Sequence, residues 1–160
     1  MLNIPMEKVA LNSPGEVDDA VFRRCLDWYA TSKGRFALNH DELEGILPFL
    51  QLHAVGDNGS KYLYCGAQSV VGDLYGQDFC VEAQGKEGVP DSAFEQTLNR
   101  DYWTVTRTET PIAQRVRAPI DVYGTKYSVE FFRYVFPVKF REFNAVGVLA
   151  RFAESPILLN

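Results

Sequence analysis

Two histidines, His40 and His53, have side chains that could supply a general base near neutral pH or a ligand to a metal or haem iron. Their separation matches no metal-binding motif, and the sequence predicts no metal site. His40 lies at an expected helix start and His53 within an expected strand, where a surface or structural histidine is the commoner finding. A catalytic role for His53 would require a carboxylate within hydrogen-bond reach.

The thiols of Cys25, Cys65 and Cys80 form an odd set without a C-x-x-C pair. This pattern predicts neither a disulfide framework nor a zinc site, and it favours a reducing cytoplasm. Cys65 lies on an expected strand, where it could form adducts or act in redox chemistry. Nothing beside it in the sequence indicates an activated thiol, so we expect it to behave as a small buried hydrophobe.

Two pairs of carboxylates, Asp73 with Asp78 and Glu82 with Glu87, could serve acid–base chemistry. They lie in a segment interrupted by glycines, where solvated loop charge is the ordinary explanation. The sequence has no nucleophile-elbow, phosphate-loop, zinc-protease or kinase motif. We therefore expect a protein that is not an enzyme, and no cofactor is specified.

The composition is that of one globular domain. A chain of 160 residues with 46% hydrophobic residues can bury a substantial core, which argues against disorder. A formal charge of −5 disfavours nucleic acid, although four arginines are grouped in the sequence: Arg100, Arg107, Arg115 and Arg117. The sequence has no signal peptide and no apolar run long enough to span a membrane, so a cytoplasmic protein without a membrane partner is expected.

These side chains would be positioned by an α+β arrangement of helices and antiparallel strands. Ser13-Pro14-Gly15-Glu16 has the pattern of a capping box and predicts a helix that runs to about Ser32. Its apolar residues form a stripe that needs a partner surface. The residues of this stripe that we expect to meet a partner or a second copy are Val17, Val21, Phe22, Trp28 and Tyr29.

Further elements follow from caps, turns and alternation. Helices are expected after Asn39 and from Ser92, in a second capping box with Glu95, to about Arg107. Short helical turns are expected between Gly66 and Gly88. The predicted strands are 49–55, 61–65, 112–118, 127–138 and 145–152. The third is placed at a sheet edge because Pro111 and Pro119 lack a backbone amide, and the last two are joined by a polar turn over 139–144.

Both faces of the strand 127–138 are apolar, so we expect the sheet to be covered on both sides. The internal helix would cover one face, and the leading helix or a second copy in a homodimer would cover the other. A cavity lined mainly by aromatic side chains is one hypothesis for a ligand site, and a filled core is the alternative. The candidate lining residues are Tyr64, Cys65, Phe79, Trp103, Phe132 and Tyr134.

The order of these elements resembles the PAS domain, and more closely a group of compact bacterial PAS-like proteins. The matching residues are Trp28, Asp41, Leu47-Pro48-Phe49, Tyr62-Leu63-Tyr64-Cys65-Gly66, Gly76-Gln77-Asp78, Tyr102, Thr110-Pro111, Tyr134-Val135-Phe136-Pro137 and Val146-Gly147-Val148-Leu149.

The resemblance implies a five-stranded antiparallel sheet with a helical crossover, formed by a core of residues 34–154 behind a helical extension of residues 1–33. It also implies a sensory module for signal transduction that binds a small molecule or a protein and signals through its outer sheet face or its leading helix. The Asn-Cys-Arg tripeptide of the flavin-binding relatives is absent, so flavin photochemistry is not expected. Two alternatives remain: a cone-shaped α+β enzyme of the dehydratase or isomerase type, and a purely structural interaction module.

Overall fold

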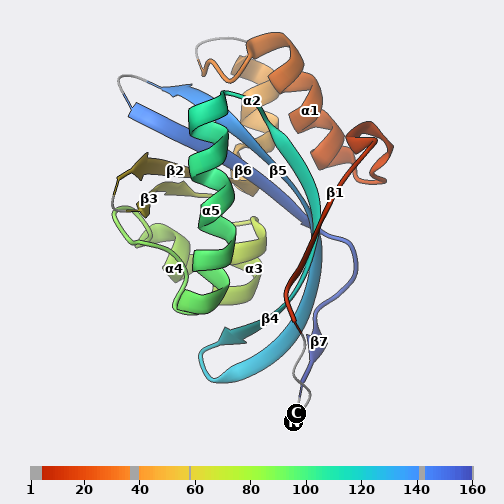
Figure 1. Ribbon diagram of the computed structural model, residues 1–160, viewed down its shortest axis with the longest axis vertical. Coiled ribbons are helices and arrows are strands. Elements are labelled where there is room, and N and C mark those ends of the chain that lie inside the picture. Colours follow the sequence, from red (N-terminus) through yellow and green to blue (C-terminus); the bar gives the residue numbers. More distant parts are fainter. Residues whose placement is uncertain (1–4, 37–39, 58, 141–142, 160) are drawn as a thin grey trace.

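The computed structural model describes residues 5–36, 40–57, 59–140 and 143–159, and its strands form one sheet with helices against it (Figure 1). The helices are α1 (Ala20–Ser32), α2 (His40–Ile46), α3 (Val70–Tyr75), α4 (Gln77–Val81) and α5 (Ser92–Thr108), with 3-10 turns at Pro14–Glu16 and Leu47–Phe49. The strands are β1 (Glu7–Ala10), β2 (Leu50–Gly56), β3 (Gly59–Cys65), β4 (Ile112–Val122), β5 (Thr125–Phe140), β6 (Phe143–Phe152) and β7 (Ile157–Leu158).

All the paired strands of the sheet are antiparallel, which confirms the predicted α+β class with an antiparallel sheet. Its order is β1-β4-β5-β6-β2-β3, and β7 pairs with β5 beside β6. The hairpin β2–β3 therefore joins the hairpin β5–β6 through the pairing of β2 with β6. The expected number of five strands is too low, because β1 and β7 also pair in the sheet and bring it to seven strands.

The prediction that the strand after Pro111 forms a sheet edge is wrong for much of its length. β1 pairs with β4 from Gln114 to Arg117, so β4 lies between β1 and β5 there. Pro119 lies beyond the segment that β1 covers, and its missing amide therefore removes no bond to that neighbour. At Pro119 itself β4 pairs with β5 alone among the described strands, so the edge prediction holds at that position.

The long hairpin of β5 and β6 extends further than its sequence pattern predicts. The register continues through Lys139 opposite Asn144, so the expected polar turn over 139–144 is partly strand. Residues 141–142 of that turn lie outside the described residues. The pairing ends with Phe140 opposite Phe143, so apolar residues lie within the segment expected to be a polar turn.

Two N-terminal caps differ from the predicted ones. The Ser13 side chain makes no capping bond, and the residues after it form only a 3-10 turn before the extended Val17. α1 begins at Ala20, where Asp19 accepts the backbone N–H of Phe22 at 2.9 Å. In α5 the cap is likewise Asp91 and not Ser92, with its carboxylate accepting the N–H of Phe94. The expected cap Asn39 of α2 lies outside the described residues.

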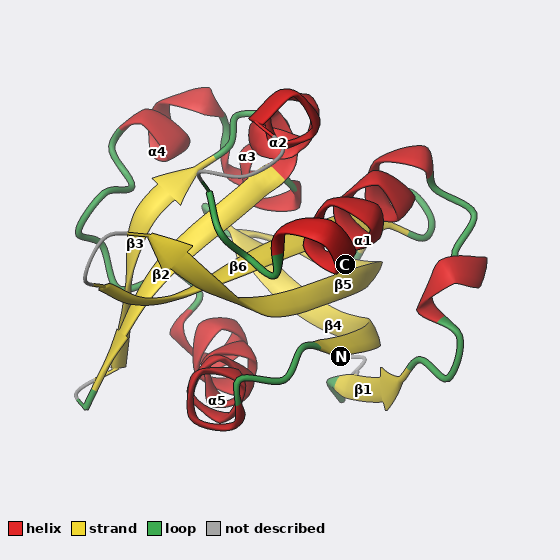
Figure 2. Ribbon diagram, turned by 90° about the horizontal axis from the view of Figure 1, so that it is seen from above, coloured by secondary structure: helices red, strands yellow, loops and turns green. Residues whose placement is uncertain are grey.

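Helices lie on both sides of the sheet, and Figure 2 shows α5 and α1 on opposite faces. One core joins α3, α4 and the start of α5 to β4 and β5, and the end of α5 packs on β5 and β6. The second core joins α1 and α2 to the opposite side chains of β2, β5 and β6. The predicted coverage of both faces is confirmed, and the cover of the outer face is the chain's own leading helix.

No helix in the described part of the chain combines the length and the apolar character that crossing a membrane requires.

Candidate functional site

A group of buried polar and aromatic side chains lies between α5 and the sheet. We call this group the polar cluster. The strands β2 and β5 contribute an amide, an imidazole and a guanidinium group. The other members are a tyrosine of β3 and two residues of α5. Its members are Gln51, His53, Tyr62, Glu95, Tyr102 and Arg133, all of them buried.

His53 is enclosed by aromatic rings. It lies on β2, where a shift in register next to it aligns it with Tyr62 on β3. Its ring centroid is 4.4 Å from that of Tyr62 and 4.7 Å from that of Tyr102. Burial in this environment lowers the pKa of His53 to about 3, because desolvation disfavours the imidazolium. His53 is therefore neutral at physiological pH.

Gln51 fixes which nitrogen of His53 carries the proton. Its side-chain oxygen lies 3.2 Å from Nε2 of His53 and accepts the hydroxyl of Tyr62 at 3.3 Å. An amide oxygen can only accept, so Nε2 must donate to it. The other nitrogen, Nδ1, then presents a lone pair, and it has no hydrogen-bond partner among the described residues.

Glu95 places a carboxyl group at the start of α5, with 6% of its surface exposed. Oε1 accepts the backbone N–H of Val89 at 3.0 Å, while Oε2 meets no hydrogen-bond partner in the described chain. Desolvation raises the pKa of Glu95 to about 7, although the bond from Val89 and the nearby Arg133 and Tyr62 oppose this rise. Both protonation states are therefore accessible near neutral pH.

The close approach of Gly88 holds this carboxyl group in place. Gly88 has φ of 151°, and a Cβ atom there would lie 2.2 Å from Cγ of Glu95. A larger residue would therefore displace the Glu95 side chain. The loop before α5 and the carboxyl group form one packed unit.

Arg133 brings a buried positive charge to the cluster from β5. Its Nε donates to the Gln114 side chain at 2.9 Å, and Nη2 pairs with Asp101, which also binds Lys8 at 2.9 Å. Its guanidinium lies 6.0 Å from the ring centroid of Tyr102. Nη1 has no partner within the residues that the structure describes, and it therefore offers a buried donor.

A surface hollow of about 350 Å³ reaches the cluster at Glu95. Its lining residues are Gly59, Ser60, Glu87, Gly88, Val89, Ser92, Glu95, Gln96 and Asn99. The hollow is bordered by the start of β3, the loop 87–89 and the first turns of α5. Of the polar cluster, Glu95 is the residue that lines the hollow, while the acceptor Nδ1 of His53 and the donor Nη1 of Arg133 lie buried in the cluster.

The residues predicted to line a ligand cavity do not come together around one space. Phe79 and Cys65 belong to the core under α3 and α4, where the Phe79 ring lies 6.1 Å from that of Tyr62. Trp103 is 45% exposed on α5, and Arg107 lies over its ring.

The remaining three candidates, Tyr64, Phe132 and Tyr134, belong to the core on the opposite face of the sheet. Alternation of side chains along β5 separates Phe132 and Tyr134 from Arg133 between them. The predicted set therefore mixes two faces and an exposed position.

The apolar stripe of the leading helix packs on the chain's own sheet. Val17, Phe22 and Trp28 are buried there, and Val21 and Tyr29 are half-buried against the same core. Phe22 and Tyr29 lie with their rings 6.3 and 5.9 Å from that of Tyr134. The stripe thus meets its partner surface without a second copy.

The sequence singles out His53 as chemically competent, although a surface or structural role is the expectation for it, and it does not predict the rest of the polar cluster. The signal was present for Gln51 and Arg133, because each interrupts the apolar residues of a predicted core strand. Glu95 was assigned to a capping box, a local role that explains its type without a site. Nothing in the sequence distinguishes Tyr62 and Tyr102 from the apolar core residues around them.

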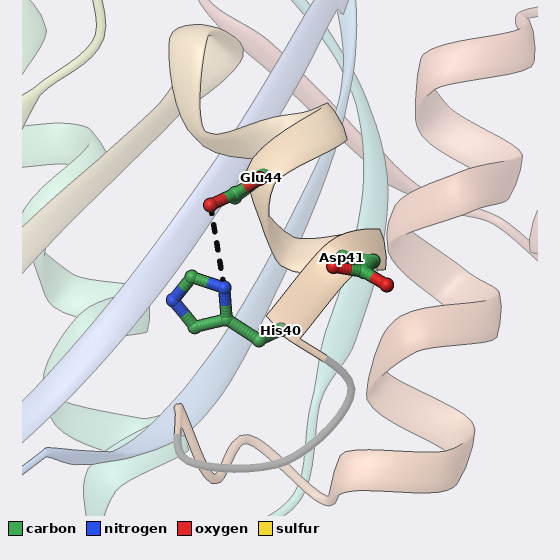
Figure 3. A group of neighbouring side chains, drawn as sticks. All are labelled: His40, Asp41 and Glu44. Carbon is green, nitrogen blue, oxygen red and sulfur yellow. Dashed lines mark ion pairs between the residues drawn. The ribbon is translucent and has the colours of Figure 1, made fainter.

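A second group of chemically active side chains lies on α2 (Figure 3). One ligand atom from each of His40, Asp41 and Glu44 lies within 4.8 Å of the others. All three residues are exposed, and an ion pair of 3.3 Å between His40 and Glu44, one helical turn apart, accounts for that part of the arrangement. A hollow of about 380 Å³ next to Asp41 is lined by α1 and α2. The group lacks the buried, oriented donors of the polar cluster.

Comparison of the chain with protein-family models, with curated proteins and with solved structures finds no match.

Proposed function

We propose that this protein is a non-catalytic, PAS-like sensory or regulatory module that binds a small polar molecule at the polar cluster. The arrangement of elements supports this proposal. Two strands, β2 and β3, are followed by the helical crossover of α3, α4 and α5 and then by the three long strands β4 to β6. The cluster lies between that crossover and the sheet, on the face where the resemblance to PAS domains implies a ligand.

The observation that carries the proposal is the set of three buried atoms that find no hydrogen-bond partner in the described part of the chain: Nδ1 of His53, Oε2 of Glu95 and Nη1 of Arg133. Each buried polar atom left unpaired costs about 1–3 kcal/mol. A bound molecule with at least one donor and one acceptor would satisfy these atoms and offset that cost. Ordered water is the competing occupant of this site. Native mass spectrometry and crystallographic electron density distinguish water from a bound organic molecule.

The surroundings of His53 favour binding over acid–base catalysis. In the dehydratase or isomerase alternative, this histidine would work with a carboxylate within hydrogen-bond reach. Its Nε2 instead contacts the Gln51 amide, and burial lowers its pKa to about 3, far below that of an effective base at neutral pH. The neutral ring is suited to accept a hydrogen bond from a ligand.

β5 offers a route by which binding would reach the outer face. Arg133 points to the polar cluster, while the next residue, Tyr134, packs against Phe22 and Tyr29 of α1. A ligand that moves Arg133 would therefore change the packing of α1 against the sheet. We expect output through α1 or the adjoining outer face, to a regulatory protein or to a second copy in a homodimer.

Native mass spectrometry of the purified protein, followed by screening of small polar metabolites for thermal stabilisation, tests the proposal. We expect either a retained non-protein mass or a stabilising compound that is lost in His53→Gln and Arg133→Met. Trp103→Ala, which changes an exposed residue on α5, is the matched control and should bind normally. A clean protein mass combined with no stabilising compound would favour the filled interaction module.

A further inference from the structure

Two cysteines from different elements meet in the core under α3 and α4. Cys65 ends β3, and Cys80 lies on α4. Their sulfur atoms are 2.8 Å apart, and both residues are buried as free thiols. The two sulfur atoms also share the carbonyl oxygen of Gly66 as a neighbour, at 4.0 and 3.5 Å.

Local structure fixes this meeting. The hydroxyl of Ser69 caps α3 by accepting the N–H of Gly72 at 3.1 Å, and Gly76, with φ of 94°, turns the chain directly into α4. Phe79 then packs between Tyr75 and Tyr62, with ring separations of 5.5 and 6.1 Å. The turn and this packing direct Cys80 toward the end of β3.

We propose that Cys65 and Cys80 form an intramolecular disulfide bond when the chain folds in the presence of a small-molecule disulfide oxidant. The sulfur atoms are already in contact, and a disulfide bond of ~2.05 Å needs only a small further approach. Cys25 lies in the other core, on the opposite face of the sheet, and takes no part.

The chemistry is a pair of thiol–disulfide exchanges. One cysteine thiolate attacks the oxidant, forms a mixed disulfide and expels one small thiolate. The second cysteine thiolate attacks the sulfur of the first, forms the protein disulfide and expels the other small thiolate. The two cysteines together lose two electrons and two protons, and the oxidant is reduced to two small thiols.

Burial determines when this exchange occurs. Both thiols are buried, which keeps an oxidant in solution away from them, and desolvation raises the pKa of the Cys65 thiol, which disfavours its nucleophilic thiolate. The exchange is therefore slow in the native state and proceeds while the core is still open. The pair acts as a folding-coupled cross-link between β3 and α4, and it restrains the strand that carries Tyr62.

The test is refolding from denaturant in a buffer of reduced and oxidised glutathione, followed by alkylation and trypsin digestion. Trypsin cuts after Lys61 and Lys86, so both cysteines lie on the peptide 62–86, whereas Cys25 begins a different peptide. We expect the peptide 62–86 to be unalkylated and lighter by two hydrogen atoms, and the Cys25 peptide to be alkylated. The oxidised protein should melt about 5–10 °C higher than the reduced protein.

Cys25→Ser is the matched control and should retain the cross-link, whereas Cys80→Ser should abolish it. Correct folding of each variant is checked by its circular dichroism spectrum. Alkylation of both Cys65 and Cys80 in refolded wild-type protein, or glutathione adducts in place of the internal bond, would overturn the proposal. This outcome is independent of whether the polar cluster binds a ligand.

Discussion

The carboxyl group of Glu95 accepts the backbone N–H of Val89 at 3.0 Å, which fastens the first turn of α5 to the loop before it. The same side chain faces the polar cluster with an oxygen that has no partner among the described residues. Glu95 therefore belongs both to the polar cluster and to the wall of the adjacent surface hollow. Its protonation state should affect both stability and binding.

The first prediction concerns the pH dependence that Glu95 introduces. Its pKa rises from an ordinary value of 4.5 to about 7 in the folded chain, so the folded state binds more protons between these values. Stability due to this group is therefore present below pH 4.5 and is lost as the pH rises to about 7, by about 3 kcal/mol. Urea unfolding across this range should show that Glu95→Gln lacks this loss. Equal pH slopes in both proteins would contradict the assignment.

His53 should have the opposite effect. Its folded pKa of about 3 is lower than its ordinary value of 6.5, so the unfolded chain binds more protons between them. The stability due to neutral His53 is present above pH 6.5 and declines as the pH falls, by roughly 3 kcal/mol at about pH 4. The difference in unfolding free energy between wild type and His53→Gln, measured at each pH, isolates this term from that of Glu95. A constant difference would show that His53 titrates normally.

The start of α1 provides a test of the observed cap. Asp19 accepts the N–H of Phe22 and also binds Arg151 at 3.0 Å through its other oxygen. Asp19→Ala should lower the unfolding free energy by about 1–2 kcal/mol, while Asp19→Asn should retain much of the cap. Ser13→Ala should change it by less than about 0.5 kcal/mol, because the Ser13 side chain makes no capping bond. A larger effect at Ser13 than at Asp19 would restore the capping-box prediction.

Gly147 permits the close packing of the central hairpin. It lies opposite Phe136, and a Cβ atom at Gly147 would come 2.4 Å from the Phe136 ring. Trp28 and Tyr29 pack against that ring and restrict its movement. Gly147→Ala should therefore cost about 1–3 kcal/mol of unfolding free energy. In a Phe136→Ala background the same substitution should cost much less, and equal costs in the two backgrounds would argue against this contact.

Much of the fold could be predicted because its signals are local. Alternation along β5 and β6 indicated the long hairpin, and glycines marked the short helices between β3 and α5. β1 and β7 could not be predicted, since Glu7–Ala10 and Ile157–Leu158 are short, largely exposed segments positioned by distant strands. The capping-box motif misplaces both caps because Ser13 and Ser92 are each followed three residues later by a glutamate, whereas Asp19 and Asp91, which do the capping, are followed there by a phenylalanine.

The polar cluster could be predicted only in part because it depends on tertiary packing. Gln51, His53 and Arg133 are polar residues in otherwise apolar strands, but no local pattern indicates that they meet or that α5 brings Glu95 and Tyr102 to them. The predicted cavity lining rests on aromatic residue type, which does not determine the face of the sheet on which a side chain lies. Alternation in β5 then places Phe132 and Tyr134 on the face opposite Arg133.

The most direct test of the proposed ligand site is a high-resolution crystal structure of the protein purified without added ligand, or soaked with a stabilising compound from the screen. We predict density for an organic molecule that contacts Nδ1 of His53, Oε2 of Glu95 and Nη1 of Arg133. Density for isolated water molecules at all three atoms, under both conditions, would contradict the proposal that the polar cluster is a ligand site.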